Sequence, residues 1–440
     1  MYPNLYYIFK DWFGVEWKAL SFLNSFGLFV ALAFIAAAWV ISSELKRKEK
    51  AGLLLPREEM ITVGKPASLM DLFLNGVMGF IFGYKVIGLF FSKPAEVNAQ
   101  DYIFSKDGNV WGGILIALVL AGLKWWEKNK QKLAAPQKRA VRIWPHDRVG
   151  DIVILALVFG ILGAKLFDNI EHWDEFIQDP IGRIFSQSGL AFYGGLIVAA
   201  IAIVWYGRKK GISIAHLTDA AAPALMIAYA IGRIGCQVSG DGDWGVFNSA
   251  YISDNEGNLS VAAPGDFQNK LQQNATYFLK GQAVNESGKL EYVTDRTYPT
   301  LDSVPHISFA GPSFLPKWLF AYSYPQNVNK DGIVMPGITD EHNRVLPQPV
   351  FPTPLYEFIL CGLLFLFMWA IRKKLTTPFM MFGIYLVLNG VERFMIESIR
   401  VNIHYNFLGM KLSQAQLIAL GLMAAGVITI VIAKMRLKKS

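Results

Sequence analysis

The segment from Ser21 to Ile41, SFLNSFGLFVALAFIAAAWVI, contains no charged residue over 21 positions. As a helix it would be about 30 Å long, at about 1.5 Å per residue, which matches the hydrocarbon core of a bilayer. Eight more apolar segments follow, at residues 72–91, 110–126, 151–167, 190–206, 217–236, 355–371, 379–397 and 415–434. The sequence therefore predicts an all-α polytopic membrane protein with about nine transmembrane helices.

The composition of the whole chain supports this prediction. Of its 440 residues, 53% are hydrophobic and 17% are charged, whereas soluble domains carry about 25% charged residues. The net charge of +8 would suggest a nucleic-acid partner in a soluble protein. Here, however, more than half of the 42 Lys and Arg residues follow the first, third, fifth, seventh and ninth segments. Because cytoplasmic loops collect basic residues, we expect the N-terminus outside, the C-terminus in the cytoplasm and no nucleic-acid partner.

The stretch 237–350 separates the sixth and seventh predicted helices. It is polar and holds 12 acidic against 7 basic residues. Such a stretch is too long for a plain connection, so we expect an extracytoplasmic loop or small domain. The chain is thus divided into residues 1–236 with helices one to six, the stretch 237–350, and residues 351–440 with helices seven to nine.

Residues 71–126 and 151–206 resemble two copies of one helical pair. Asp71, Ile81, Gly83 and Lys85 recur 80 positions later as Asp151, Ile161, Gly163 and Lys165, and Trp111-Gly112-Gly113 recurs 82 positions later as Tyr193-Gly194-Gly195. Both copies have the same predicted orientation, which indicates a parallel repeat rather than an inverted one. The alternative is a chance match between segments that are rich in small and apolar residues.

Arg233 lies near the outer end of the sixth predicted helix. Ionisable groups inside membrane helices cost about 2.5–3.5 kcal/mol each, so they are candidates for a functional site. A glycine-rich stretch that includes Gly240 and Asp241 follows Arg233. A guanidinium with five donors suits a phosphate, and glycines let the backbone approach a headgroup closely. The alternative is an arginine that merely extends to the membrane interface.

The eighth predicted helix carries the largest group of polar residues, namely Asn389, Glu392, Arg393, Glu397 and Arg400. Arg393, Glu397 and Arg400 are spaced i, i+4 and i+7, which places them on one helical face. That face must point toward protein or a water-filled cavity, because lipid exposure of three charges is too costly. It forms either a functional site or a structural ladder of salt bridges.

Two further features concern helix ends. Tyr193-Gly194-Gly195 begins the fifth predicted helix on the outer side, where a tyrosine is often an interface residue. The paired glycines favour either close backbone packing or the approach of a ligand. Asp219, near the inner end of the sixth helix, is expected to cap that helix. Because the charged groups converge on the outer leaflet, the sequence predicts a site for an anionic phospholipid.

Several motifs together resemble the prolipoprotein diacylglyceryl transferase family. Gly232-Arg233-Ile234-Gly235, followed by Gly240-Asp241, is similar to the family signature G-R-x-G-N-F-x-N-G-E. The segment from Phe351 to Glu357, FPTPLYE, is similar to H-P-S-Q-L-Y-E, and Arg393, Glu397 and Arg400 are similar to R-x-x-x-E-x-x-R. The resemblance covers most of 20–41 and 151–434 and includes Asn24-Ser25-Phe26-Gly27 in the first segment.

The resemblance implies a bacterial inner-membrane enzyme that transfers a diacylglyceryl group from phosphatidylglycerol to the thiol of a lipobox cysteine in prolipoprotein signal peptides. Arg233 and Arg393 would hold the phosphate, with Glu397 orienting Arg393. Tyr193 would complete the catalytic group. The implied substrate-binding residues are Gly194, Gly195, Gly240, Asp241, Asn389, Arg400 and Tyr356. No cofactor or metal is expected, and Cys236 and Cys361 have no metal-ligand spacing.

The chain departs from the family pattern at several positions: the Asn, Phe, Asn and Glu of the signature are Cys236, Gln237, Ser239 and Asp241 here. Tyr193 stands where the family has a histidine, and Asn389 stands where it has a tyrosine. The base that accepts the thiol proton is therefore open between Tyr193, Asp241, Glu397 and His404, and the thiol could also ionise unaided near the arginines. Two other functions remain as alternatives, a catalytically inactive scaffold that binds anionic phospholipid and a transporter.

Overall fold

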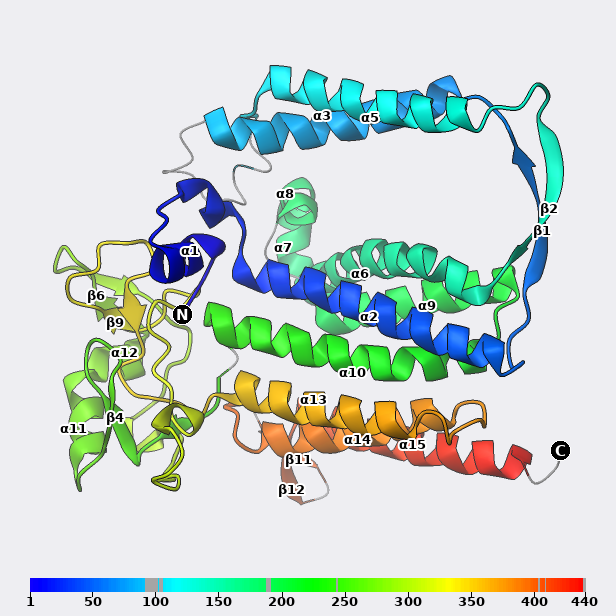
Figure 1. Ribbon diagram of the computed structural model, residues 1–440. Coiled ribbons are helices and arrows are strands. Elements are labelled where there is room, and N and C mark those ends of the chain that lie inside the picture. The colour runs from blue at the N-terminus through cyan, green and yellow to red at the C-terminus, as the bar shows by residue number, and fades with distance from the viewer. Residues whose placement is uncertain are drawn as a thin grey trace. The chain divides into compact units, whose positions relative to one another are not determined.

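The computed structural model describes residues 1–91, 102, 106–186, 191–242, 244–402, 404–407 and 409–437. Every predicted apolar segment is helical (Figure 1): α2 (Ser25–Lys50), α3 (Leu69–Phe91), α5 (Val110–Lys130), α6 (Val149–Glu171), α9 (Phe192–Lys210), α10 (Ile214–Ser239), α13 (Thr353–Ile371), α14 (Met380–Glu397) and α15 (Gln414–Leu437). Seven of these described helices, all but α9 and α14, are long and apolar enough to cross a membrane. The predicted fold class, an all-α polytopic membrane protein, is confirmed.

The chain divides into two compact units. The first unit contains Met1–Ile8, Asn24–Ile41 and Thr218–Ser440, and the second contains Phe9–Leu23 and Ser42–Leu217. Most of α2 and all of α13, α14 and α15 therefore belong to the first unit, together with nearly all of α10. The second unit holds two helical pairs, α3 with α5 and α6 with α9.

The two helical pairs of the second unit pack through glycines at equivalent positions. A β-carbon on Gly83 of α3 would collide with the carbonyl oxygen of Gly112 on α5. In the other pair, a β-carbon on Gly163 of α6 would collide with the carbonyl oxygen of Gly194 on α9. Both pairs are therefore tight hairpins built on the same contact, as close backbone packing requires. Duplication of one pair from the other stays a prediction.

A two-stranded antiparallel sheet, β1 (Arg57–Val63) with β2 (Gln137–Ile143), lies at the end of the α3–α5 pair (Figure 1). It joins that pair to the rest of the second unit. Arg148 holds this end through Glu59, with 2.6 Å between Nη2 and Oε2. An ion pair thus contributes to the order of this end of the second unit.

In the first unit, Asp219 links two helices. Its carboxylate oxygens accept hydrogen bonds from the backbone N–H groups of Phe379 and Phe382, both at 2.9 Å. These groups lie at the N-terminus of α14, where backbone donors have no partner inside the helix and the helix dipole is positive. Asp219 therefore caps a neighbouring helix rather than its own, α10, contrary to the sequence prediction.

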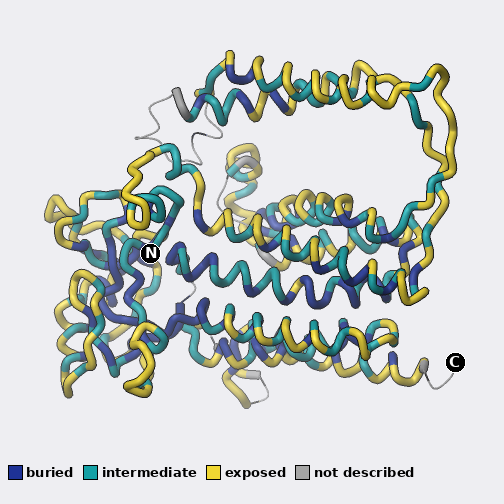
Figure 2. Tube along the Cα trace, in the orientation of Figure 1, coloured by how far each residue is buried: buried dark blue, intermediate teal, exposed yellow. Residues whose placement is uncertain are grey.

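Residues 244–352 form a small domain between α10 and α13, which we call the insertion domain. Its core includes Trp244, Phe267, Phe278, Tyr324 and Leu346, and the buried segments are dark blue in Figure 2. The domain contains α11 (Asp266–Gln273), α12 (Ala275–Lys280) and the short strand pairs β3 (Phe247–Asn248) with β8 (His306–Ile307), β4 (Tyr251–Ser253) with β5 (Leu259–Val261), β6 (Gln282–Val284) with β7 (Leu290–Tyr292), and β9 (Ile333–Val334) with β10 (Arg344–Val345). A hairpin of β11 (His404–Phe407) and β12 (Met410–Ser413) precedes α15.

Candidate active site

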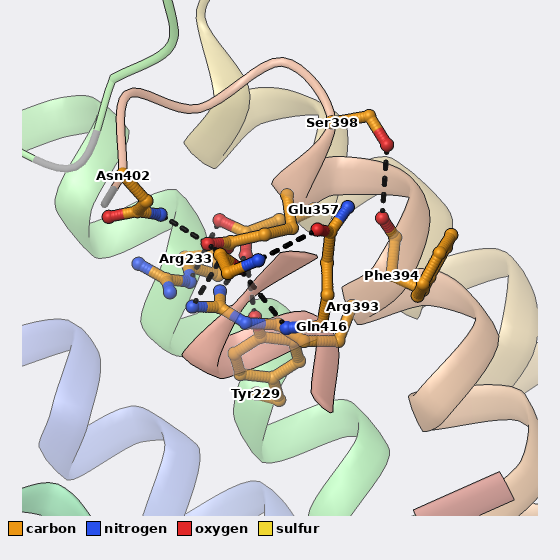
Figure 3. A network of polar contacts seen from close by, with 10 residues as sticks. Tyr229, Arg233, Glu357, Arg393, Phe394, Ser398, Asn402 and Gln416 are labelled. Atoms are coloured by element: carbon orange, nitrogen blue, oxygen red, sulfur yellow. Dashed lines mark hydrogen bonds and ion pairs between the residues drawn. The ribbon is translucent and has the colours of Figure 1, made fainter. Parts of the chain in front are cut away.

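Three helices of the first unit bring charged side chains together around one carboxylate (Figure 3). Glu357, in the second turn of α13, is fully buried. Its Oε2 lies 3.0 Å from Nε of Arg233 on α10, and its Oε1 lies 3.3 Å from Nη1 of Arg393 on α14. A buried charge is tolerated only when it is paired, so this carboxylate determines where both guanidinium groups lie.

Tyr229 completes the environment of Glu357. It lies one turn before Arg233 on α10, so both side chains point to the same face of the helix. The Tyr229 hydroxyl donates a hydrogen bond of 2.6 Å to Oε1 of Glu357, and the guanidinium carbon of Arg233 lies 5.3 Å from the centre of the tyrosine ring. The ring thus stacks near the cation while its hydroxyl holds the anion.

Glu397, the last residue of α14, holds Arg393 from the other side. Its Oε2 lies 3.5 Å from Nη2 of Arg393. Its Oε1 accepts hydrogen bonds from Ser413 Oγ at 2.8 Å and from the side-chain amide of Asn402. Oε2 makes this ion pair but no hydrogen bond among the described residues, and only 2% of the residue is exposed, so Glu397 positions Arg393 and has little access to a substrate. We call Arg233, Glu357, Arg393 and Glu397 the charged cluster.

The exposure of the charged cluster is uneven. The Glu357 side chain is completely shielded, whereas 13% of the Arg233 side chain and 24% of the Arg393 side chain remain exposed. The carboxylate is therefore structural, and the two guanidinium groups retain surface that a ligand can contact. Two arginines held in this way form a preorganised site for a phosphate or another oxyanion.

The position of Arg400 differs from the sequence prediction. α14 ends at Glu397, so Arg400 lies three residues beyond the end of the helix rather than within it. Its backbone forms an antiparallel bridge with Gly245, and Val246 N–H donates to Ile399 O at 2.9 Å. The helix stops here because the chain pairs instead with the segment that follows α10.

The glycine-rich stretch after Arg233 forms the end of α10. The N–H groups of Gly240 and Asp241 both donate to the carbonyl oxygen of Cys236 at 3.0 Å, and Gly240 has a φ of +71°. This is a helix end that favours glycine, and a β-carbon there would lie 2.8 Å from Cβ of Asn327. Gly240 thus packs against the insertion domain.

Asp241 and Arg233 both lie close to the thiol of Cys236. The Cys236 Sγ atom is 3.9 Å from Nη1 of Arg233 and 4.0 Å from Oδ2 of Asp241. Asp241 is partly exposed, unlike Glu397. Of the two carboxylates considered from the sequence as a base, Asp241 is therefore the more accessible one.

The other predicted site residues are dispersed. Tyr356 donates a hydrogen bond of 2.6 Å to the carbonyl oxygen of Leu319 in the insertion domain, and Asn389 lies one turn before Arg393 on α14, partly buried. Tyr193 is 46% exposed and begins α9 in the second unit, where Gly194 and Gly195 pack against α6. Asn389 and Tyr356 thus lie on the two helices that carry Arg393 and Glu357, and the site roles of Tyr193, Gly194, Gly195, Asn389 and Tyr356 stay predictions. The His404 side chain lies outside the described part of the chain.

Sequence reasoning singled out Arg233, Arg393 and Glu397 but gave no role to Glu357, Tyr229 or Ser413. Glu357 is the last residue of the FPTPLYE motif. Its charge, near the start of a membrane helix, is the sequence feature from which its importance could have been predicted. Tyr229 could have been found from its i, i+4 spacing to Arg233. Ser413 offers no such signal, because its contact with Glu397 depends on the β11–β12 hairpin.

Glu392 is also buried, with 3% of its surface exposed, but neither of its oxygens has a hydrogen-bond partner among the described residues. It lies one position before Arg393 on α14. In the same described part of the chain, no group of three or more His, Cys, Asp or Glu residues could hold a metal ion.

Comparison with known proteins identifies the family. The model of the prolipoprotein diacylglyceryl transferase family matches residues 113–432, more than two thirds of the chain. This chain belongs to the prolipoprotein diacylglyceryl transferase family. The resemblance predicted from the sequence motifs is thus confirmed, and the matched range contains α6 to α14, most of α15 and the whole charged cluster.

Individual members of the prolipoprotein diacylglyceryl transferase family match shorter ranges. A phosphatidylglycerol–prolipoprotein diacylglyceryl transferase of Dehalococcoides mccartyi is 33% identical over 171 residues, which cover 38% of this chain and 62% of the relative. Proteins of the same name from Bacillus cereus and Leptospira interrogans are 35% and 37% identical over 127 and 124 residues, covering 28% and 23% of this chain and 44% and 39% of the relatives. The chain thus matches less than two thirds of the length of each of these relatives.

Proposed function

We propose that this chain transfers the diacylglyceryl group of phosphatidylglycerol to the thiol of the lipobox cysteine in prolipoproteins, at the outer face of the bacterial inner membrane. The observation that carries the proposal is the fully buried Glu357, which holds Arg233 and Arg393 together from two other helices. The names of the relatives support the same reaction. The distribution of basic residues supports an outer N-terminus and a cytoplasmic C-terminus.

In this reaction the sulfur attacks the glyceryl carbon that carries the phosphate ester. A carbon–sulfur bond forms and the carbon–oxygen bond to phosphate breaks, with its electron pair remaining on the phosphate oxygen. The products are the thioether-linked diacylglyceryl peptide and glycerol phosphate, and the thiol proton passes to a base. Arg233 and Arg393 bind the phosphate and stabilise the charge that develops on it. Glu397 positions Arg393.

We assign the role of base to Asp241. It is partly exposed at the end of α10, and its carboxylate is separated from Arg233 only by the Cys236 thiol. A base must reach the proton directly or through one water molecule. Glu397 is buried and already accepts hydrogen bonds from Ser413 and Asn402, so it is the weaker candidate.

The test uses the full chain reconstituted in liposomes with a lipobox peptide. We expect mass spectrometry to detect a diacylglyceryl adduct on the peptide in vesicles that contain phosphatidylglycerol, and none with phosphatidylethanolamine alone. A peptide with serine in place of the lipobox cysteine should remain unmodified. Binding of phosphatidylglycerol without any adduct would contradict the proposal and support the inactive scaffold.

Matched substitutions distinguish the roles of the arginines. Arg233→Lys and Arg393→Lys preserve the charge but remove the planar fork, so each should lower the transfer rate strongly. Arg372→Lys is the control, because Arg372 lies at the other end of α13, over the ring of Trp369. Equal activity of the three variants would refute phosphate binding by the charged cluster. Asp241→Asn should lower kcat because the base is lost, and it should do so more strongly than Asp302→Asn, a substitution at an exposed position of the insertion domain.

A further inference from the structure

Among the described residues of the insertion domain, the segment from Ile307 to Trp318 exposes the largest group of apolar side chains close together in sequence. Five large side chains are exposed there, each by at least 38%: Ile307, Phe309, Phe314, Leu315 and Trp318. Phe314 is the most exposed of them, at 83%. We call these five residues the 307–318 patch. Exposed apolar side chains gathered in one short segment mark an interaction surface.

The backbone of this segment is fixed by hydrogen bonds to the rest of the domain. The side-chain amide of Asn248 donates to the carbonyl oxygens of Phe309 and Phe320, at 2.9 and 3.0 Å. Gly311 N–H donates to the Tyr251 hydroxyl at 3.1 Å, and Lys317 Nζ donates to Leu259 O at 3.3 Å. The apolar side chains are thus presented by an ordered loop rather than left exposed by a lack of structure.

The 307–318 patch lies next to the beginning of a membrane span. The Tyr356 hydroxyl donates a 2.6 Å hydrogen bond to Leu319 O, one residue after Trp318. Tyr356 is in the first turn of α13, which begins at Thr353 and is one of the helices able to cross a membrane. The end of such a helix lies at the membrane–water interface, where Trp and Tyr side chains are enriched.

The sequence around the 307–318 patch also differs in charge from the rest of the insertion domain. Residues 237–350 carry more acidic than basic residues, yet no Asp or Glu occurs between Asp302 and Asp331, and Lys317 lies in the same segment as the patch. Acidic side chains would be repelled by anionic headgroups, and their absence removes that barrier. Large apolar and aromatic side chains with a lysine are typical of segments that enter the interfacial region of a bilayer.

We propose that the 307–318 patch inserts into the headgroup and upper acyl region of the leaflet on the side of the insertion domain. The occupant of the patch is thus the lipid surface itself. The insertion domain is already connected to α10 and α13 by the chain itself. Insertion of the patch adds contacts with lipid, which hold the domain at the membrane beside α13. The proposal does not depend on the transfer activity.

The test measures the depth of spin labels on the full chain in lipid nanodiscs. Phe314→Cys and Trp318→Cys report on the patch, and Leu290→Cys is the matched control, because Leu290 is 56% exposed on β7 of the same domain, beside Glu291. Cys236 and Cys361 are buried, and the unsubstituted protein treated with label gives the background. Collisions of each label with oxygen and with a water-soluble nickel complex are then compared.

We expect the ratio of oxygen to nickel collisions to be several-fold higher at positions 314 and 318 than at position 290. Equal, water-like ratios at all three positions would overturn the proposal. Shielding of positions 314 and 318 from both reagents would also overturn it, since that result indicates a protein contact such as a second copy of the chain. Shielding that develops only after a signal peptide is added would identify the peptide as the occupant and would equally refute insertion into lipid.

Discussion

Glu357 in the charged cluster and Asp331 in the insertion domain are both buried carboxyl groups, yet their partners differ. Glu357 is placed between two arginines from other helices. Asp331 accepts a 2.7 Å hydrogen bond from the hydroxyl of Tyr277, and its backbone N–H donates to Asn327 Oδ1 at 2.9 Å. Burial raises the pKa of Asp331.

The difference shows what each carboxyl group contributes. The Asp331 side chain is held by a neutral donor, and the contact fastens α12 to the loop before β9 without binding a charged partner directly. Glu357 holds two cations in the membrane part of the bundle, and these cations are partly exposed while the carboxylate is not. A buried ion pair is weak evidence for stability alone, so the second arrangement points to function.

The largest effect is expected from removal of the Glu357 charge. Glu357→Leu leaves the two largely buried, partly exposed guanidinium groups without their shared partner, which should cost up to about 3–5 kcal/mol of stability and abolish transfer. Thermal unfolding in detergent and the lipobox transfer assay measure the two effects. Asp331→Leu is the comparison, because it should destabilise the insertion domain without moving the arginines. Full activity of a folded Glu357→Leu protein would contradict the role of the cluster.

The next effect concerns the geometry of Arg393. Its Nη1 and Nη2 atoms lie near Glu357 and Glu397 respectively, a fork that lysine cannot reproduce. Loss of one charge-assisted contact costs about 1.5–3 kcal/mol, so Arg393→Lys should lower kcat/KM roughly tenfold to hundredfold. Arg344→Lys in the insertion domain, where Arg344 donates to Gly332 O at 2.8 Å, should leave kcat/KM unchanged. A comparable loss in both variants would indicate a general effect on folding.

The sequence predicted the membrane helices closely because their signal is local. The predicted segment 355–371 corresponds to α13 at Thr353–Ile371, since apolar windows of this length, here with the single charge of Glu357, are rare in any other context. Arg233 and Arg393 were found for the same reason, as costly charges in apolar surroundings. Gly194 and Gly195 of α9 were also identified from the sequence, and close backbone packing was one of the two roles predicted for them.

The fold of the insertion domain and the role of Glu357 could not be predicted, because they depend on contacts between residues that are distant in the sequence. The insertion domain uses strands of two or three residues, and β3 pairs with β8 from Phe247 to His306, too short and too distant for a periodic pattern. The role of Glu357 required the knowledge that α13 reaches both α10 and α14. Arg400 was assigned to the face of α14 because spacing alone does not reveal that the helix ends at Glu397.

A smaller, pH-dependent effect is expected at Asp331. Because its pKa is raised in the folded protein, the folded state binds more protons than the unfolded state between the ordinary aspartate pKa, about 3.9, and the raised value. The contribution of Asp331 to stability therefore falls as pH rises through this window and stays at its lower level above it. Asp331→Asn should remove this slope in unfolding measured over a pH series, while Asp302→Asn, at an exposed position, should retain it. An unchanged slope in Asp331→Asn would contradict this assignment.

The smallest effect is expected at Glu392, the buried carboxyl whose oxygens have no hydrogen-bond partner in the described part of the chain. Glu392→Gln keeps the shape and removes the charge, so no paired contact is lost and the cost of burying a charge disappears. The thermal midpoint should therefore stay the same or rise, and transfer should continue. Glu357→Gln, at the same depth of burial, should instead lose both stability and activity because it weakens two ion pairs. A marked loss of activity in a stable Glu392→Gln protein would show that Glu392 exchanges a proton with the substrate, and Asp241 would then no longer be the preferred base.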